Sequence, residues 1–304
     1  MGIDLSVQIG SLTLKNPVML ASGCCAYGTE MEEYLDLARV GGVCLKGLSL
    51  NGSEGNPPPR IWETQGGMLN AIGLQNVGVK VFLEEKVPLL EGTDTVFVAN
   101  FYGSKVEEYV ATARALDAID MLSALEMNIS CPNINEGGIH FGTKPESVLA
   151  LTQACREATK KPLWVKLSPN AADVAEIARA AEEGGADALT CINTMPAMAI
   201  DIEKRTFRLS NRIGGLSGPA IKPIAVRVVY QVSRAVSIPV VGVGGISKAE
   251  DVVELMLAGA SAVQVGTALF TDPYCPLDII AGIEDYCEGH GFKSVSELTG
   301  AVND

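Results

Sequence analysis

The sequence predicts an α/β fold, a (β/α)8 TIM barrel in a single domain that spans residues 1–304. Short apolar runs of strand length occur eight times, an amphipathic helical pattern follows each run, and no linker or low-complexity tract divides the chain. Eight such units in 304 residues are typical of a closed barrel rather than an open doubly wound sheet. An open dinucleotide-binding sheet would also carry G-x-G-x-x-G after an early strand, and that motif is absent.

The elements are predicted in chain order. Residues 7–16 alternate in polarity around Gly10-Ser11, which indicates an N-terminal hairpin ahead of the barrel. The predicted barrel strands are residues 17–21, 42–48, 95–99, 124–127, 163–167, 188–192, 239–243 and 262–265. Helices are predicted near residues 30–40, 78–90, 104–118, 145–160, 171–184, 220–236, 248–259 and 276–289. Gly184-Gly185 and Gly259 stand where two of these helices should end.

Two connections are too long to be simple turns. They are residues 49–77 and 194–219, both rich in glycine, and they follow the second and the sixth predicted strands. Loops that follow barrel strands lie on the face where active sites are built. Long loops in a compact domain are usually functional, so we expect both to cover or line a binding site.

Composition and charge exclude several classes of function. With 23 basic and 36 acidic residues the net charge is −13, which opposes nucleic-acid binding and attraction to an anionic membrane. A small-molecule reaction or a protein partner is expected instead. The 8 cysteines show no C-x-x-C spacing, which argues against disulfides, zinc or an iron–sulfur cluster built by this chain alone. No signal-peptide pattern or apolar run of about 20 residues is present, so a cytoplasmic location is expected.

The stretch Asn128-Ile129-Ser130-Cys131-Pro132-Asn133 directly follows the apolar run 121–127, which reads as a buried strand. Two side-chain amides and a thiol therefore emerge where that strand ends. The thiol can exchange a proton, and the amides offer donors and acceptors to a planar polar ring. A cysteine at a strand end is also often only a small buried hydrophobe, and Asn128-Ile129-Ser130 has the form of a glycosylation acceptor.

Residues that can hold a polar ligand stand near or just after the end of every predicted strand. They are Ser22, Lys46, Asn100, Asn128, Lys166, Asn193, Gly244-Gly245 and Gly266-Thr267. The two glycine pairs follow strands seven and eight, the usual place for a phosphate on this fold, and they predict a phosphate-bearing ligand. Glycine there can alternatively just relieve packing at a tight turn.

Lys46 and Lys166 stand within or beside apolar runs, where a charge needs an anionic partner such as a carboxylate or an electron-rich cofactor ring. Such a lysine can alternatively extend its ammonium to solvent. Residues 70–76 form a segment that can fold over the site or remain a solvated turn. His140 and His290 do not suggest a metal pair, and no metal site is predicted.

Taken together, these motifs resemble the catalytic subunit of the class 1 dihydroorotate dehydrogenases, FMN-containing (β/α)8 barrels, over almost the whole chain. The stretch 128–133 is similar to the active-site loop of that family, and residues 70–74 are similar to its substrate loop. Further matches are Val165-Lys166-Leu167-Ser168-Pro169, Ile192-Asn193-Thr194, Gly215-Leu216-Ser217-Gly218-Pro219-Ala220 and the two glycine turns.

The resemblance implies oxidation of (S)-dihydroorotate to orotate in de novo pyrimidine (UMP) biosynthesis. Cys131 is the implied base that removes a proton from C5, while a hydride passes from C6 to the flavin. The implied FMN-binding residues are Ser22, Lys46, Gly47, Asn100, Asn128, Lys166, Ile192, Gly218, Gly244, Gly245, Gly266 and Thr267. The implied substrate-binding residues are Lys46, Asn70, Ala71, Ile72, Gly73, Leu74, Asn128, Asn133, Asn193 and Thr194.

Residues 136–143 resemble the NAD-linked subclass, 1B, which pairs this subunit with a second one that carries FAD and a 2Fe–2S cluster. The implied assembly is a heterotetramer built on a homodimer of this chain, with NAD as the acceptor. Three alternatives remain: a fumarate-linked class 1A enzyme, a flavin barrel like that of dihydropyrimidine dehydrogenase, and a barrel that binds a phosphorylated ligand without turnover.

Overall fold

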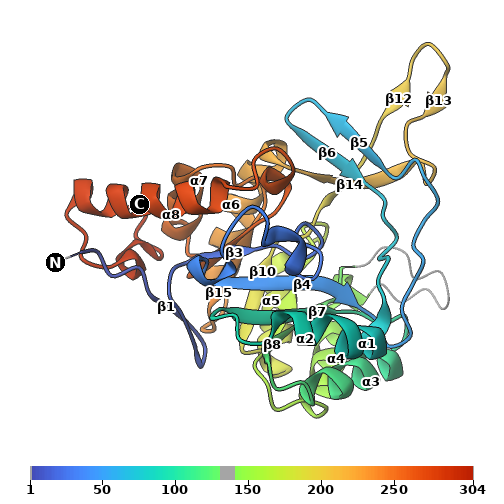
Figure 1. Ribbon diagram of the computed structural model, residues 1–304, viewed down its shortest axis with the longest axis horizontal. Helices are drawn as coiled ribbons and strands as arrows, with labels where there is room; N and C mark the ends of the chain where they lie inside the picture. The colour runs from blue at the N-terminus through green and yellow to red at the C-terminus, as the bar shows by residue number, and fades with distance from the viewer. Residues whose placement is uncertain (1, 131–140, 304) are drawn as a thin grey trace.

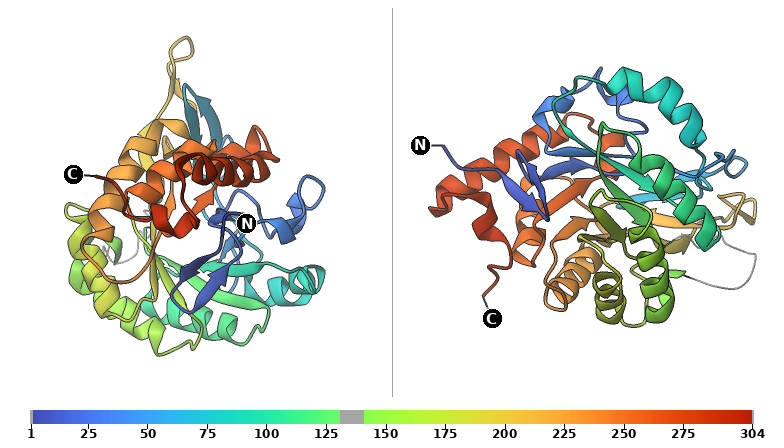
Figure 2. Two further views of the ribbon diagram at one scale, coloured as in Figure 1. Left: turned by 90° about the vertical axis from the view of Figure 1, so that its left-hand side faces the viewer. Right: turned by 90° about the horizontal axis from the view of Figure 1, so that it is seen from below.

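A computed structural model describes residues 2–130 and 141–303. In this part of the chain, parallel strands close into a barrel of order β10-β15-β16-β3-β4-β7-β8-β9, with helices around it (Figures 1 and 2). The barrel strands are β3 Val18–Leu20, β4 Gly42–Leu48, β7 Val96–Phe101, β8 Leu122–Asn128, β9 Leu163–Lys166, β10 Ala188–Cys191, β15 Val240–Val243 and β16 Ala262–Val265. The predicted barrel and all of its predicted strands are confirmed.

Helices follow most barrel strands and pack outside them. They are α1 Gly78–Val81 and α2 Val87–Leu90 with the π-helical segment Phe82–Lys86 between them, α3 Val106–Asp117, α4 Pro145–Arg156, α5 Val174–Glu183, α6 Lys222–Ser233, α7 Ala249–Leu257 and α8 Cys275–His290. None of the described helices is both long enough and apolar enough to span a bilayer.

The helix predicted for residues 30–40 is wrong. The structure has two short 3-10 turns there, Thr29–Met31 and Leu37–Arg39. Asp36 separates them because its backbone is extended and its side chain accepts a hydrogen bond from the backbone N–H of Ala38. A short polar side chain that bonds to its own backbone in this way competes with a continuous helix.

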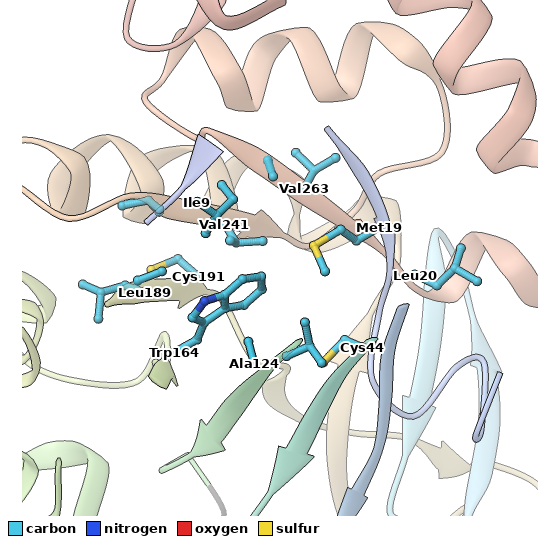
Figure 3. Close-up of a cluster of buried hydrophobic side chains, with 14 of the residues drawn as sticks. Ile9, Met19, Leu20, Cys44, Ala124, Trp164, Leu189, Cys191, Val241 and Val263 are labelled. Atoms are coloured by element: carbon cyan, nitrogen blue, oxygen red, sulfur yellow. The ribbon is translucent and has the colours of Figure 1, made fainter. Parts of the chain in front are cut away.

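Apolar side chains fill the barrel interior (Figure 3). Trp164, Met19 and Val241, which come from three different strands, are fully buried there. The predicted N-terminal hairpin is confirmed as β1 Val7–Ile9 and β2 Leu12–Leu14. It packs at the amino ends of the strands, since its turn lies close to the residue that precedes β10. The other end of the barrel is thereby left for a site.

The two long loops meet over the carboxyl ends of the strands. Loop 49–77 contributes β5 Ile61–Thr64 and β6 Gly67–Asn70, and loop 194–219 contributes β11 Met195–Met198 and β14 Ile213–Ser217. These strands form one antiparallel sheet of order β11-β14-β6-β5, and a small hairpin of β12 Ile200–Asp201 and β13 Thr206–Phe207 extends beyond it (Figure 1). Both predicted long loops are confirmed, whereas their strands were not predicted.

Candidate active site

A cavity of about 810 Å³ lies between the barrel mouth and this antiparallel sheet. Every predicted site residue within the described part of the chain lines it. They are Ser22, Lys46, Gly47, Asn70, Ala71, Ile72, Gly73, Leu74, Asn100, Asn128, Lys166, Ile192, Asn193, Thr194, Gly218, Gly244, Gly245, Gly266 and Thr267. The predicted base Cys131 and the predicted substrate ligand Asn133 lie outside the described residues.

The barrel register explains why these residues meet. Asn128 and Lys166 are the last residues of β8 and β9, and they pair directly across the two parallel strands. Parallel strands bring their carboxyl ends to one rim, so residues far apart in sequence become neighbours there. The β-sheet above adds the loop residues, because Asn70 of β6 pairs with Gly215 of β14.

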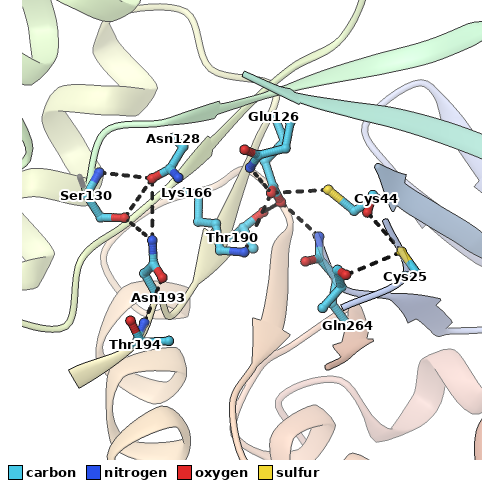
Figure 4. A network of polar contacts seen from close by, with 12 residues as sticks. Cys25, Cys44, Glu126, Asn128, Ser130, Lys166, Thr190, Asn193, Thr194 and Gln264 are labelled. Carbon is cyan, nitrogen blue, oxygen red and sulfur yellow. Dashed lines mark hydrogen bonds and ion pairs between the residues drawn. The ribbon is translucent and has the colours of Figure 1, made fainter. Parts of the chain in front are cut away.

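Asn128, Ser130 and Asn193 form a hydrogen-bonded cluster at the rim (Figure 4). The side-chain oxygen of Asn128 accepts bonds from the Ser130 backbone N–H at 3.2 Å and hydroxyl at 2.8 Å, and from Nδ2 of Asn193 at 3.4 Å. Nδ2 of Asn193 also donates to the Ser130 hydroxyl. With Oδ1 of Asn128 occupied, its Nδ2 has no partner among the described residues and remains available to a ligand.

Below the rim, a buried carboxylate that sequence analysis did not identify supports the site. Glu126 of β8 is fully buried and lies 3.7 Å from the ammonium of Lys166. It also accepts hydrogen bonds from Asn100 and from Gln264 (Figure 4). Burial alone would raise the pKa of Glu126, but Lys166 and the donors outweigh burial and hold it below the ordinary value. Glu126 is the anionic partner that the sequence required for Lys166.

Lys46 differs from Lys166 because the described residues offer its ammonium no hydrogen-bond acceptor and no carboxylate within ion-pair distance. The residue is half-buried at the cavity wall. Burial lowers its pKa, and the nearby Arg60 acts in the same direction. A cation that is partly removed from water and has no partner is suited to an anionic ligand.

The glycine turns after β15 and β16 leave little room for a side chain. Gly245 has φ of 78°, and a Cβ on it would lie 2.5 Å from the Cβ of Lys222. A Cβ on Gly266 would lie 3.3 Å from the sulfur of Cys24. Both turns line the cavity. Bare backbone N–H groups at this position of a barrel are suited to a phosphate, as the sequence predicted.

The donor set also fits a flat polar cofactor ring. Gln264 of β16 is fully buried and lines the cavity, and its side-chain oxygen is a buried acceptor without a partner among the described residues. A buried acceptor of this kind calls for a donor from a ligand. Sequence reasoning missed Gln264 and Glu126, and the available signal was a polar residue inside an apolar strand run.

Comparisons with known proteins agree with this geometry. A family model described as dihydroorotate dehydrogenase matches residues 4–286. The chain is 54% identical over 298 residues to the dihydroorotate dehydrogenase B (NAD(+)), catalytic subunit, of Trichlorobacter lovleyi, with 98% of each chain covered. It is 54% identical over 299 residues to the subunit of the same name from Geobacter sulfurreducens, again with 98% of each chain covered. The identity to that from Bacteroides fragilis is 52% over 299 residues, which cover 98% of this chain and 99% of the relative.

Proposed function

The chain belongs to the dihydroorotate dehydrogenase family as a catalytic subunit of the NAD(+)-linked type, and from this premise we propose an FMN-dependent mechanism with Cys131 as the base. The enzyme oxidises (S)-dihydroorotate to orotate in pyrimidine biosynthesis. The observation that carries the mechanism is the convergence of amide, ammonium and backbone groups on one cavity.

FMN would be held along the cavity from its phosphate to its ring. The backbone N–H groups of Gly245, Gly266 and Thr267, which line the cavity, would bind the phosphate. Lys166, Asn100 and Gln264 line the part of the cavity beside Glu126 and suit the polar end of the ring. When bound, FMN supplies the acceptor for the hydride that leaves C6 of the substrate.

Substrate recognition is assigned to the amides of the rim and to Lys46. Asn70, Asn128 and Asn193 offer donors and acceptors that match the alternating groups of a pyrimidine ring. Asn133 and Thr194 complete the proposed set. The ammonium of Lys46, which has no partner among the described residues, binds the substrate carboxylate, and this group separates dihydroorotate from dihydrouracil.

Cys131 removes the proton from C5. Its neighbour Ser130 is tied to the rim by hydrogen bonds to Asn128 and Asn193, so the loop that carries the thiol starts from a defined point beside the cavity. A general base held in place contributes about 10²- to 10⁴-fold to such a step.

Electrons pass from this chain to NAD(+) through a partner subunit. This sequence has no dinucleotide fingerprint and no cysteine spacing for a cluster. We therefore assign FAD and a 2Fe–2S cluster to the partner, in a heterotetramer built on a homodimer of this chain.

Anaerobic reduction of the purified chain tests the proposal. The protein should be yellow, bind FMN, and be bleached by dihydroorotate and much less by dihydrouracil. With the partner subunit present, turnover should depend on NAD(+) rather than fumarate. A colourless chain that FMN does not reconstitute would contradict the cofactor assignment, and equal bleaching by both substrates would contradict the role of Lys46.

A further inference from the structure

Glu126 is held by hydrogen bonds and an ion pair to side chains from several other barrel strands. It is fully buried inside β8. Its partners come from the strands β4, β7, β9, β10 and β16. They are Asn100 at 2.7 Å and, as Figure 4 shows, Cys44 at 3.2 Å, Lys166 at 3.7 Å, Thr190 at 2.8 Å and Gln264 at 2.8 Å.

These partners fall into two groups. Asn100, Lys166 and Gln264 line the cavity, whereas Cys44, Thr190 and Glu126 itself do not. Glu126 therefore lies directly beneath the cavity floor, and the floor is made of side chains that it holds.

The contacts determine which atoms remain for a ligand. Gln264 donates its Nε2 to Glu126, which leaves its Oε1 as the buried acceptor without a described partner. The ammonium of Lys166 is held at 3.7 Å, beyond ordinary hydrogen-bond distance, so its N–H donors are not consumed by the carboxylate. A different side chain at position 126 would reorient both groups.

We propose that Glu126 is a positioning residue for the cofactor: it orients Lys166, Asn100 and Gln264 toward the cavity, and its negative charge lowers the reduction potential of the bound flavin. The inference rests on the proposed function, because it requires FMN in this cavity. Reduction adds negative charge to the cofactor, which Lys166 stabilises and a carboxylate beneath the floor opposes. Glu126 thus moderates the effect of Lys166.

Two variants change the effective negative charge at Glu126 in opposite directions. Glu126→Gln removes the charge, so the reduction potential of bound FMN should become more positive. It also replaces one acceptor oxygen by an amide NH2 that cannot accept from the partners of Glu126, so the affinity for FMN should fall. Thr190→Val removes the hydroxyl that donates to Oε2 of Glu126 and partly screens it. The potential should then shift in the opposite direction, to more negative values. If Glu126 only stabilised the fold, the two variants would not shift the reduction potential of bound FMN in opposite directions.

Asp187→Asn is the matched control. Asp187 accepts hydrogen bonds from Arg156 and from the Leu163 backbone at the amino ends of the strands, on the far side of the barrel from the cavity. Like Glu126→Gln, Asp187→Asn removes one carboxylate that pairs with a cation. It should nevertheless leave the reduction potential of bound FMN unchanged.

The potentials are measured by anaerobic titration of the flavin spectrum against a reference dye, and FMN affinity by fluorescence titration. Wild-type potentials in both Glu126→Gln and Thr190→Val would overturn the inference while the proposed function stands. If Glu126→Gln does not fold, an unchanged or more positive potential in Thr190→Val overturns it. A wild-type chain that does not bind FMN would overturn the proposed function and this inference together.

Discussion

Lys166 and Glu126 form a buried ion pair beneath the cavity, with Nζ and Oε1 3.7 Å apart and side chains 8% and 0% exposed. A buried pair of this kind does not by itself add much stability, because both charges lose their hydration. Removing one partner is costly, since the other charge then remains buried without compensation. The pair is therefore better explained by what it does for the cavity than by stability.

The stability of the fold should depend on pH through Glu126. Its pKa is lowered in the folded chain and returns to about its ordinary value of 4.5 on unfolding. The carboxylate therefore contributes stability above that pH, and this contribution is lost as the pH falls toward the folded pKa. Glu126→Gln should cost about 3–5 kcal/mol near neutral pH. We expect this difference to narrow as the pH is lowered below about 4.5 in urea unfolding. A difference in unfolding free energy that stays constant with pH would contradict a lowered pKa of Glu126 in the folded chain.

Cys131→Ala should slow the reduction of bound FMN by dihydroorotate about 10²- to 10⁴-fold, because the proton acceptor at C5 is lost. FMN should remain bound, since the thiol is not part of the proposed cofactor set. Stopped-flow absorbance under anaerobic conditions measures the rate directly.

Cys24 provides the matched control because its thiol also lines the cavity. Burial raises its pKa to about 11, although Lys166 and Lys46 act in the opposite direction, so it is a poor base near neutral pH. Cys24→Ala should be reduced at a rate within a few-fold of the wild type. An equal loss in both variants would show that the effect is not specific to Cys131.

The barrel was predictable because each of its strands is a local apolar run followed by a helical pattern. The strands over the mouth were not predictable in this way. Asn70 and Gly215 pair across the two long loops, and such pairing depends on contacts far apart in sequence. The helix predicted for 30–40 failed at Asp36, where a local side-chain hydrogen bond interrupts it.

In the site, the residues predicted at the strand ends do line the cavity, because parallel strands bring their carboxyl ends together at one rim. The residue beneath them was missed. Glu126 is visible in the sequence as a charge inside an apolar run, but its partners among the described residues come from separate strands that only the closed barrel brings together. The role of Cys131 remains a prediction.

Lys46→Met should weaken orotate binding about 10- to 100-fold, because a charge-assisted hydrogen bond to the carboxylate contributes about 1.5–3 kcal/mol. Turnover of dihydrouracil, which lacks the carboxylate, should change little. Perturbation of the flavin spectrum by orotate gives the dissociation constant. If Lys46→Met slowed the turnover of dihydroorotate and of dihydrouracil equally, Lys46 would not be the residue that binds the carboxylate.

The affinity for orotate should also fall at alkaline pH. Burial lowers the pKa of Lys46, so its ammonium loses the proton at a lower pH than an ordinary lysine does. Binding that needs the charge is present below the folded pKa and is lost above it. The wild type should show this alkaline loss and Lys46→Met should not, and a loss that persists in the variant would assign it to another group.

Gly245→Ala should impair FMN binding through its phosphate. The new Cβ would lie 2.5 Å from the Cβ of Lys222, and φ of 78° adds strain of about 1–2 kcal/mol. Gly92→Ala is the matched control, because it has a similar φ of 86° and open space around its Cβ. Titration with FMN and with riboflavin, which lacks the phosphate, separates the effects. We expect Gly245→Ala to lose at least about tenfold in FMN affinity but little for riboflavin, and Gly92→Ala to lose stability alone. Equal losses for the two flavins would mean that this turn supports the ring and not the phosphate.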